Sequence, residues 1–242
     1  MAKRKGGRGG STLPRPLNGT RISEGWDLPH GGRIRLARPG EVPAVDALLD
    51  PVGVKVESLA AQGVDDGSLA TLLKAGLDGG QNALALSVAT AIAGRELKDA
   101  VPGLSLLLVA EDPQRQIVGA LTAMPPYSVV GALADRGVSG ERLAFLCMVI
   151  AKISGLAVAD TARGRGIGTQ LLKRATQIYQ QLSFQLVYGQ FDDDSAPLPA
   201  FYASRGFTVK AVGESEDLSV FLGIPLAVHS GPTERLFTRW RR

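Results

Sequence analysis

A glycine-rich segment, ADTARGRGIGT at residues 159–169, carries the clearest chemistry in the chain. Its glycines alternate with other residues where an amphipathic pattern begins, at Gly164, Gly166 and Gly168. Glycine lets the backbone approach a ligand closely, and the first amides of a helix lack internal partners and lie at the positive end of its dipole. With Arg163 and Arg165 at the rim, the segment predicts a pocket for an anion such as a diphosphate.

Other interpretations of this segment stay open, and the simplest is a tight glycine turn that binds nothing. A Walker-type loop is excluded, because it needs Lys and then Ser or Thr after the last glycine, whereas Gly168 is followed by Thr169 and Gln170. A Rossmann-type dinucleotide site is the second interpretation, because Asp192 lies near the end of the next predicted strand. Its glycine spacing differs, however, and residues 159–163 separate the strand from the first glycine.

Two regular elements must position the glycine segment. Residues 147–158, CMVIAKISGLAV, form a continuous apolar run, which predicts a strand in the middle of a sheet. From Gly168 to Leu182, apolar residues recur at spacings of three and four, which predicts an amphipathic helix. A central strand, a glycine turn and a helix N-terminus are therefore expected to meet at the anion pocket.

The remaining elements predict a mixed α/β fold. Residues 104–124 predict an antiparallel hairpin whose turn contains Asp112 and Pro113. Residues 50–100 form a Leu- and Ala-rich helical block with a break at Gly79 and Gly80, and residues 125–143 are expected to be irregular with a short helix. Further strands are predicted at 33–38, 184–191, 207–213 and 234–240, and further helices at 39–50 and 197–206.

Charge divides the chain into a tail and a body. Residues 1–23 hold six of the 27 basic residues and no acidic residue. The remainder therefore contains 21 basic and 23 acidic residues. We expect residues 1–23 to be disordered, because they lack the apolar residues that offset ordering entropy. Residues 24–242 are long and apolar enough to form a single domain with a substantial core. Nucleic acid is expected as a partner only through the basic tail.

The longest apolar runs are far shorter than the roughly 20 residues of a membrane span, so no membrane partner is expected. The single cysteine, Cys147, lies inside FLCMVIA, which predicts a small buried hydrophobe and not a nucleophile. This cysteine usage, and the lack of an apolar stretch behind the basic start, favour a cytoplasmic location. His30 and His229 are far apart, which predicts structural or surface roles and no metal site.

Two segments resemble the GNAT superfamily of N-acetyltransferases. ISGLAVADTARGRGIGTQLLKRA is similar to the acetyl-CoA-binding segment of that family, whose motif Q/R-x-x-G-x-G/A follows a strand with a Leu-Ala-Val-like end. Arg163, Gly166 and Gly168 occupy its defining positions. SAPLPAFYASRGF resembles the later Asn-x-x-x-x-x-x-Tyr-x-x-x-Gly-Phe helix, with Ser195 at the Asn position and Tyr202 at the Tyr position. The clear match covers residues 152–208.

The resemblance implies an α/β (α+β) fold, with a mixed, mostly antiparallel central sheet that splays between its fourth and fifth strands and is flanked by helices. It implies that the strand backbone pairs with the pantetheine arm, that the glycine segment surrounds the diphosphate, and that Tyr202 donates a proton to the departing thiolate. Ser195 stands where a cofactor-binding amide is usual, and capping of the next helix is its alternative role. The implied cofactor-binding residues are Leu156, Ala157, Val158, Arg163, Gly164, Arg165, Gly166, Ile167, Gly168, Thr169 and Ser195.

The implied activity is transfer of an acetyl group from acetyl-CoA, without a metal, to a primary amine of a small molecule or protein by direct attack. The central strand has no acidic residue where many family members place a general base, so a catalytically silent acetyl-CoA-binding sensor or partner module is the alternative. Glu111 and Asp112 are expected in the hairpin turn. The other carboxylates considered are expected to be ordinary solvated charges: Glu141, Glu216 and Asp217.

The acceptor is an amine that the sequence does not identify further. By resemblance, the helical block and the loop at 125–142 frame its pocket, and their apolar composition shows no preference for charge. A monomer or a homodimer is expected.

Overall fold

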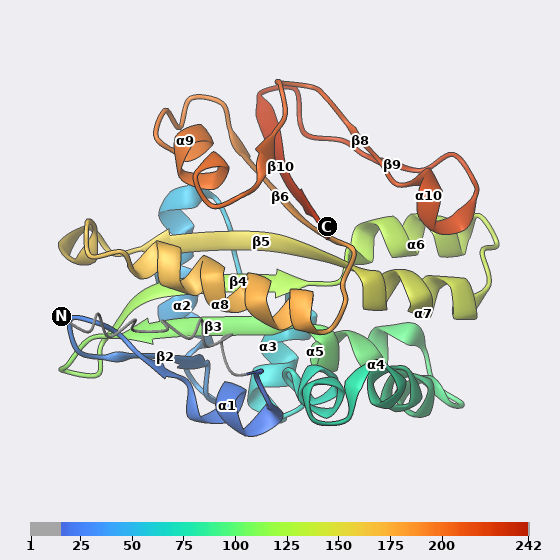
Figure 1. Cartoon of the computed structure of the whole chain (residues 1–242), viewed down its shortest axis with the longest axis horizontal. Helices are drawn as coiled ribbons and strands as arrows, with labels where there is room; N and C mark the ends of the chain where they lie inside the picture. The colour runs from blue at the N-terminus through green and yellow to red at the C-terminus, as the bar shows by residue number, and fades with distance from the viewer. Residues whose placement is uncertain (1–15, 242) are drawn as a thin grey trace, which may run out of the picture.

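The computed structural model describes residues 16–241 and is organised by one eight-stranded sheet (Figure 1). The strands run in the order β1-β2-β3-β4-β5-β6-β10-β7, and every neighbouring pair is antiparallel except β5 and β6. Their bounds are β1 (Trp26–Asp27), β2 (Arg33–Leu36), β3 (Leu106–Glu111), β4 (Ile117–Met124), β5 (Ile150–Val158), β6 (Leu186–Asp192), β7 (Thr208–Val209) and β10 (Glu234–Trp240). A second small sheet pairs β8 (Glu216–Asp217) with β9 (Ala227–Val228). The predicted mixed, mostly antiparallel fold is confirmed.

Helices cover both faces of the sheet, as Figure 1 shows, with α8 in front of the strands and α2 behind them. A Cβ added to Gly119 of β4 would lie 2.8 Å from Ile167 at the start of α8, whereas one on Gly155 of β5 would lie 3.1 Å from Leu49 of α2. The first helices are α1 (Gly19–Glu24), α2 (Val42–Leu49), η1 (Asp50–Val52), α3 (Ser58–Asp65), α4 (Thr71–Ile92), η2 (Leu97–Ala100) and α5 (Val101–Leu104). The later ones are α6 (Tyr127–Asp135), α7 (Gly140–Val149), η3 (Asp160–Ala162), α8 (Ile167–Gln181), α9 (Leu198–Ala203) and α10 (Ser219–Leu222).

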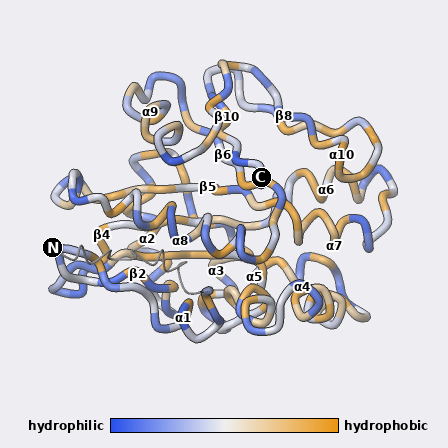
Figure 2. Tube along the Cα trace, in the orientation of Figure 1, coloured by the Kyte–Doolittle hydropathy of each residue, from blue (hydrophilic) through white to orange (hydrophobic). Residues whose placement is uncertain are grey.

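The core lies between these layers, and Figure 2 shows hydrophobic residues following the central strands. Every residue of β3 is buried, which explains its continuous apolar sequence. The predicted break in the helical block is confirmed at Gly80, whose φ of 79° interrupts α4.

The predicted tail and the folded part overlap. Residues 1–15 of the tail lie outside the described residues. Residues 19–23, however, belong to α1, where Ile22 is fully buried. The Leu17 amide also donates to the side chain of Gln181, at 2.7 Å. The fold therefore begins before residue 24, because a short apolar pair, Leu17 and Ile22, anchors this segment on the core.

Residues 125–149 correct two predictions. The segment 125–143, expected to be irregular with a short helix, forms α6 and the first turn of α7. Residues 147–149, expected to begin the central strand, end α7. The buried residues of α7 are spaced like one face of a helix: Leu143, Ala144, Leu146 and Cys147. A short apolar run does not by itself distinguish a buried strand from a buried helix, and here the run contains both.

Candidate functional site

The parallel pair β5 and β6 opens part of the way along its length. The two strands pair only from Ile150 with Leu186 to Ile153 with Gly189. Beyond this point β5 continues to Val158 beside β4, while β6 continues beside β10. The opening lies between the strands predicted at 147–158 and 184–191, the fourth and fifth of the predicted order, where the resemblance implies a splay.

The orientation of the β5 backbone determines which of its N–H and C=O groups point into the opening. The Ala159 amide donates to the Val118 carbonyl of β4 at 2.9 Å. Because adjacent residues of a strand direct their polar groups to opposite edges, Ala157 also faces β4, where it pairs with Ala120. Leu156 and Val158 then direct their N–H and C=O groups into the opening. The backbone bonds predicted for Ala157 are thus taken by the sheet.

A β-bulge sets this direction. The register between β4 and β5 shifts between Thr122 and Ala123, which leaves Ser154 as an extra residue on β5. The extra residue reverses which residues face β6, so Ile153 faces it before the bulge and Leu156 faces the opening after it. The bulge therefore lies where the two strands separate.

The N-terminus of α8 lies at the end of this free edge. Gly166 is the N-cap, with a φ of 74°, and its carbonyl accepts the first internal helix bond from Gln170 at 3.0 Å. The amides of Ile167, Gly168 and Thr169 therefore have no partner inside the helix. A Cβ added to Gly164 or Gly166 would meet nothing within 4 Å. Open space thus lies over unpaired amides, as an anion pocket requires.

Gly168, in the first turn of α8, lies near the end of β5 and near α9. A Cβ added there would lie 3.6 Å from Cγ2 of Val158 and 3.7 Å from Cζ of Phe201. These are ordinary contact distances, so Gly168 is not needed for packing in the free protein.

The predicted arginines differ in what they touch. Arg163 forms an exposed ion pair with Asp160 at 2.8 Å, and its Nε approaches the Val158 carbonyl at 3.4 Å, so it braces the loop. Arg165 is exposed at the rim of the glycine segment.

A third arginine, Arg205, reaches the N-terminus of α8 and was not predicted. Its Nε and Nη2 donate to Oγ1 of Thr169 at 3.1 and 2.5 Å, and its guanidinium lies 3.8 Å from the ring centroid of Phe201. Nη1 donates to the Phe201 carbonyl at 2.6 Å. The spacing of four between Phe201 and Arg205 in the helix predicted at 197–206 was the available signal, because residues four apart share a helix face. In the structure α9 ends at Ala203, and Arg205 lies in the turn that follows.

Tyr202 of α9 is buried against the strands β6 and β10. Its ring stacks on Phe237 of β10, with centroids 3.7 Å apart, and on Phe191 of β6, with centroids 5.5 Å apart. Burial raises the pKa of the Tyr202 hydroxyl, so this group stays protonated at neutral pH. Ser195 is half-buried before α9, but its Oγ contacts the neighbouring Asp194 carboxylate at 3.5 Å and makes no cap hydrogen bond to the helix.

The carboxylates considered from the sequence are engaged elsewhere. Glu111 is the last residue of β3, not part of the turn, and it is buried against Arg35 of β2. This correction reflects the hairpin register, which extends β3 to Glu111. Asp112 is in the turn, as predicted, and accepts from the Gln116 amide at 2.9 Å.

Glu216 accepts from Nε1 of Trp240 at 3.2 Å, and Asp217 accepts from the Ser219 amide at 2.8 Å. Glu141 is exposed in the first turn of α7. A different carboxylate, Glu234, lies at the strand ends that border the opening. There it accepts from Nε2 of Gln190 at 2.9 Å.

Cys147 is a buried free thiol, as predicted, and burial raises its pKa to about 12. Within residues 16–241, no group of three or more His, Cys, Asp and Glu side chains is arranged to hold a metal ion. A search of the same residues for a helix with the length and apolar character of a membrane span found none.

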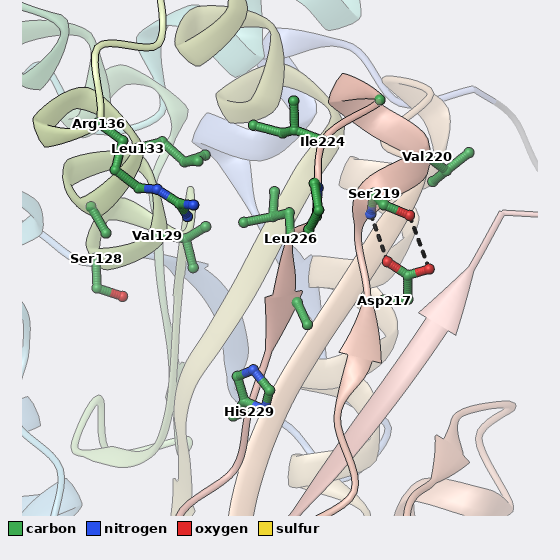
Figure 3. A pocket seen from close by; sticks show the side chains of 14 residues that line it. Ser128, Val129, Leu133, Arg136, Asp217, Ser219, Val220, Ile224, Leu226 and His229 are labelled. Carbon is green, nitrogen blue, oxygen red and sulfur yellow. Dashed lines mark hydrogen bonds between the residues drawn. The ribbon is translucent and has the colours of Figure 1, made fainter.

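A cavity of about 1100 Å³ lies between α6 and the β8–α10–β9 segment (Figure 3). One wall comes from residues 128–136, inside the loop expected to frame an acceptor pocket. The helical block at residues 50–100, also expected there, contributes none of the lining residues. The opposite wall carries His229, which is exposed there, in keeping with the surface role predicted for it.

Residues 103–209 match the family model described as acetyltransferase (GNAT) domain. The chain is similar to a GNAT-family acetyltransferase from Staphylococcus aureus Mu50, at 10% identity over 88% of this chain and 100% of that one, with a TM-score of 0.48. Arabidopsis thaliana NAA60 in complex with a bisubstrate analogue matches at 14% identity over 86% and 98%, with a TM-score of 0.48. A GNAT-family acetyltransferase from Elizabethkingia anophelis with acetyl-CoA bound matches at 18% identity over 63% and 87%, with a TM-score of 0.38. No curated protein matches the sequence.

Proposed function

Because the chain belongs to the GNAT superfamily of acetyltransferases, we propose that it transfers the acetyl group of acetyl-CoA to a primary amine. The observation that carries this proposal is the free edge of β5, where Leu156 and Val158 direct backbone groups that have no partner in the sheet into an opening that ends at the N-terminus of α8. An extended amide-bearing arm followed by a diphosphate has the chemistry to occupy both parts. Acetyl-CoA contains that arm and that diphosphate, and it supplies an activated acetyl thioester.

The backbone would bind the two halves of this cosubstrate differently. The pantetheine arm would add to β5 as a short extra strand, through the N–H and C=O groups of Leu156 and Val158. The diphosphate would accept hydrogen bonds from the amides of the segment 164–169. Arg165 would approach its outer side, while Arg163 keeps the loop in place through Asp160.

Arg205 would complete the charge at this end. Its guanidinium is fixed by Thr169 and by the ring of Phe201, so little side-chain entropy remains to be lost when an anion arrives. A planar guanidinium also recognises phosphate oxygens with more than one donor.

Tyr202 would act at the other end as the proton donor to the departing thiolate. Its stack on Phe237 fixes the ring, and its raised pKa keeps the hydroxyl protonated at neutral pH, so that a proton is present for the departing thiolate. A thiol has an ordinary pKa of about 8.5, so its thiolate needs this proton less than an alkoxide would, and a moderate effect is expected.

The first experiment measures binding and chemistry separately. Calorimetry with coenzyme A should show binding to the wild-type chain, and free-thiol release from acetyl-CoA should rise when a suitable amine is present. Leu156→Pro should weaken coenzyme A binding, because it removes the one N–H of that residue that faces the opening and no bond within the sheet. Ala157→Pro is the matched control, since it removes a bond to β4 and should lower stability instead.

The outcomes separate three interpretations. Absence of coenzyme A binding would contradict the proposal. Binding without thiol release on any amine would favour the silent acetyl-CoA-binding module. Binding that Leu156→Pro leaves unchanged would show that the free edge of β5 does not hold the pantetheine arm.

A further inference from the structure

The cavity beside α6 is lined largely by aliphatic side chains. Its sides are aliphatic and include Val129 and Leu133 of α6 and Ile224 and Leu226 between α10 and β9. Its volume of about 1100 Å³ is slightly above the usual range of pockets that hold small molecules, about 300–1,000 Å³. An apolar body of several carbons therefore fits between these walls.

The charged groups that line the cavity and the hollow beside it differ in their partners. Asp217 is already satisfied, because it accepts from the Ser219 amide at 2.8 Å and from its hydroxyl at 3.0 Å, and these bonds lower its pKa (Figure 3). Arg142, in the adjoining hollow of about 540 Å³, donates to the Leu222 carbonyl. Arg136 lines both hollows and makes no side-chain hydrogen bond or ion pair with the described residues. Arg136 is exposed, so its donors are available to an anionic group of a ligand.

Arg136 and His229 lie at different places in the cavity. In Figure 3 the Arg136 side chain lies beside Leu133 and Val129 on one wall, and His229 lies apart from it on the opposite wall, toward the bottom of the view. The chain runs from His229 to Glu234, which pairs with Asp192 at the open end of β6. The other wall follows Met124, which pairs with Lys152 two residues before the bulge on β5. Both walls therefore join the sheet where β5 and β6 separate, and the His229 end is the one closer in the chain to the open strand ends.

We infer that the acceptor is an amine joined to a carboxylate through an apolar chain, with the carboxylate on Arg136 and the amine at the His229 end. This inference rests on the proposed function and names its acceptor. A polyamine would place a second cation against Arg136, which repels it, and an α-amino acid would place its amine and carboxylate at the same end. A chain that separates the two charges satisfies both ends of the cavity.

The test compares matched acceptors by free-thiol release from acetyl-CoA. The pairs are ω-aminohexanoate with hexylamine and ω-aminooctanoate with octylamine, which share a chain and differ in the carboxylate. A charge-assisted hydrogen bond in a partly enclosed site predicts that kcat/KM is about tenfold higher for the carboxylate member. In Arg136→Gln the ratio between the two members should fall to about one, and a general loss of activity would not change that ratio. Arg95→Gln removes an exposed charge from outside the cavity and should keep the wild-type ratio.

Three results would overturn the inference: equal kcat/KM for both members in the wild type, a preference that survives in Arg136→Gln, or turnover of leucine, a polyamine or a protein but of neither member of any pair. Calorimetry with coenzyme A on the same preparations distinguishes a failure of this inference from a failure of the proposed function. If only the inference about the acceptor fails, the protein still binds coenzyme A with unchanged affinity.

Discussion

The guanidinium of Arg205 donates two hydrogen bonds to one oxygen, Oγ1 of Thr169, at 3.1 and 2.5 Å. The contact joins the last turn after α9 to the first turn of α8, 36 residues apart in the chain. It places a fixed positive charge beside three helix amides that have no internal partner.

Arg205→Met should weaken coenzyme A binding by about tenfold, because it removes this positive charge. The methionine side chain can still pack on the ring of Phe201. Calorimetry with coenzyme A and with pantetheine checks the cause. Pantetheine lacks the phosphates, so its affinity should be the same in both proteins. An equal loss for the two ligands would indicate instead that Arg205 only holds α9 against α8.

Gly168→Ala should separate stability from binding. The new methyl group meets only ordinary contacts with Val158 and Phe201, and alanine favours helix over glycine by up to about 1 kcal/mol. The thermal midpoint should therefore stay the same or rise. The same methyl group fills space between the strand and the helix amides, so the Kd for coenzyme A should increase about tenfold or more. Unchanged affinity would place the diphosphate elsewhere.

Tyr202→Phe should lower kcat several-fold and leave the affinity for coenzyme A nearly intact. The ring stack on Phe237 survives the substitution, whereas the proton donor is lost. Steady-state rates and calorimetry on one preparation measure both quantities. An unchanged kcat would remove the proton-donor role and leave Tyr202 as a packing residue.

Acid should weaken a buried ion-pair cluster that joins β2, β3 and the start of α2. Burial alone would raise the pKa of Glu41, but hydrogen bonds from the side chain of Arg35 and the amide of Arg38 lower it overall. A carboxylate with a lowered pKa contributes stability that is present above its unfolded-state pKa and is lost as pH falls through the folded value.

Glu41→Gln should therefore cost about 2 kcal/mol of unfolding free energy at neutral pH, and the difference from the wild type should shrink as pH falls below about 4.5. Urea unfolding at several pH values measures it. Asp27→Asn is the control, because its ion pair with Arg33 is exposed and should contribute less than about 1 kcal/mol. A difference that is constant with pH would contradict the assignment to the Glu41 carboxylate.

Cys147 should react with a thiol reagent only when the chain opens. The side chain is buried in α7 and burial raises the pKa of its thiol to about 12, so little thiolate is present at neutral pH. Labelling in native buffer should be slower by orders of magnitude than labelling in denaturant. Equal rates would mean that α7 is not packed as described.

The local pattern of the chain was enough to predict the elements around the anion pocket. Alternating glycines before an amphipathic stripe fixed where α8 begins, because unpaired amides and left-handed backbone are properties of a few adjacent residues. The buried thiol of Cys147 and the break at Gly80 follow from equally local chemistry.

Only the tertiary structure decided which groups face one another. The bulge at Ser154 determines that Leu156, and not Ala157, faces the opening, and it depends on the register with β4. Arg205 reaches Thr169 and His229 faces the cavity with Arg136 because segments distant in the chain pack together. The spacing of apolar residues along the sequence indicates whether a segment forms a helix or a strand. Contacts between elements depend on how distant segments pack together, which the pattern of one segment does not determine.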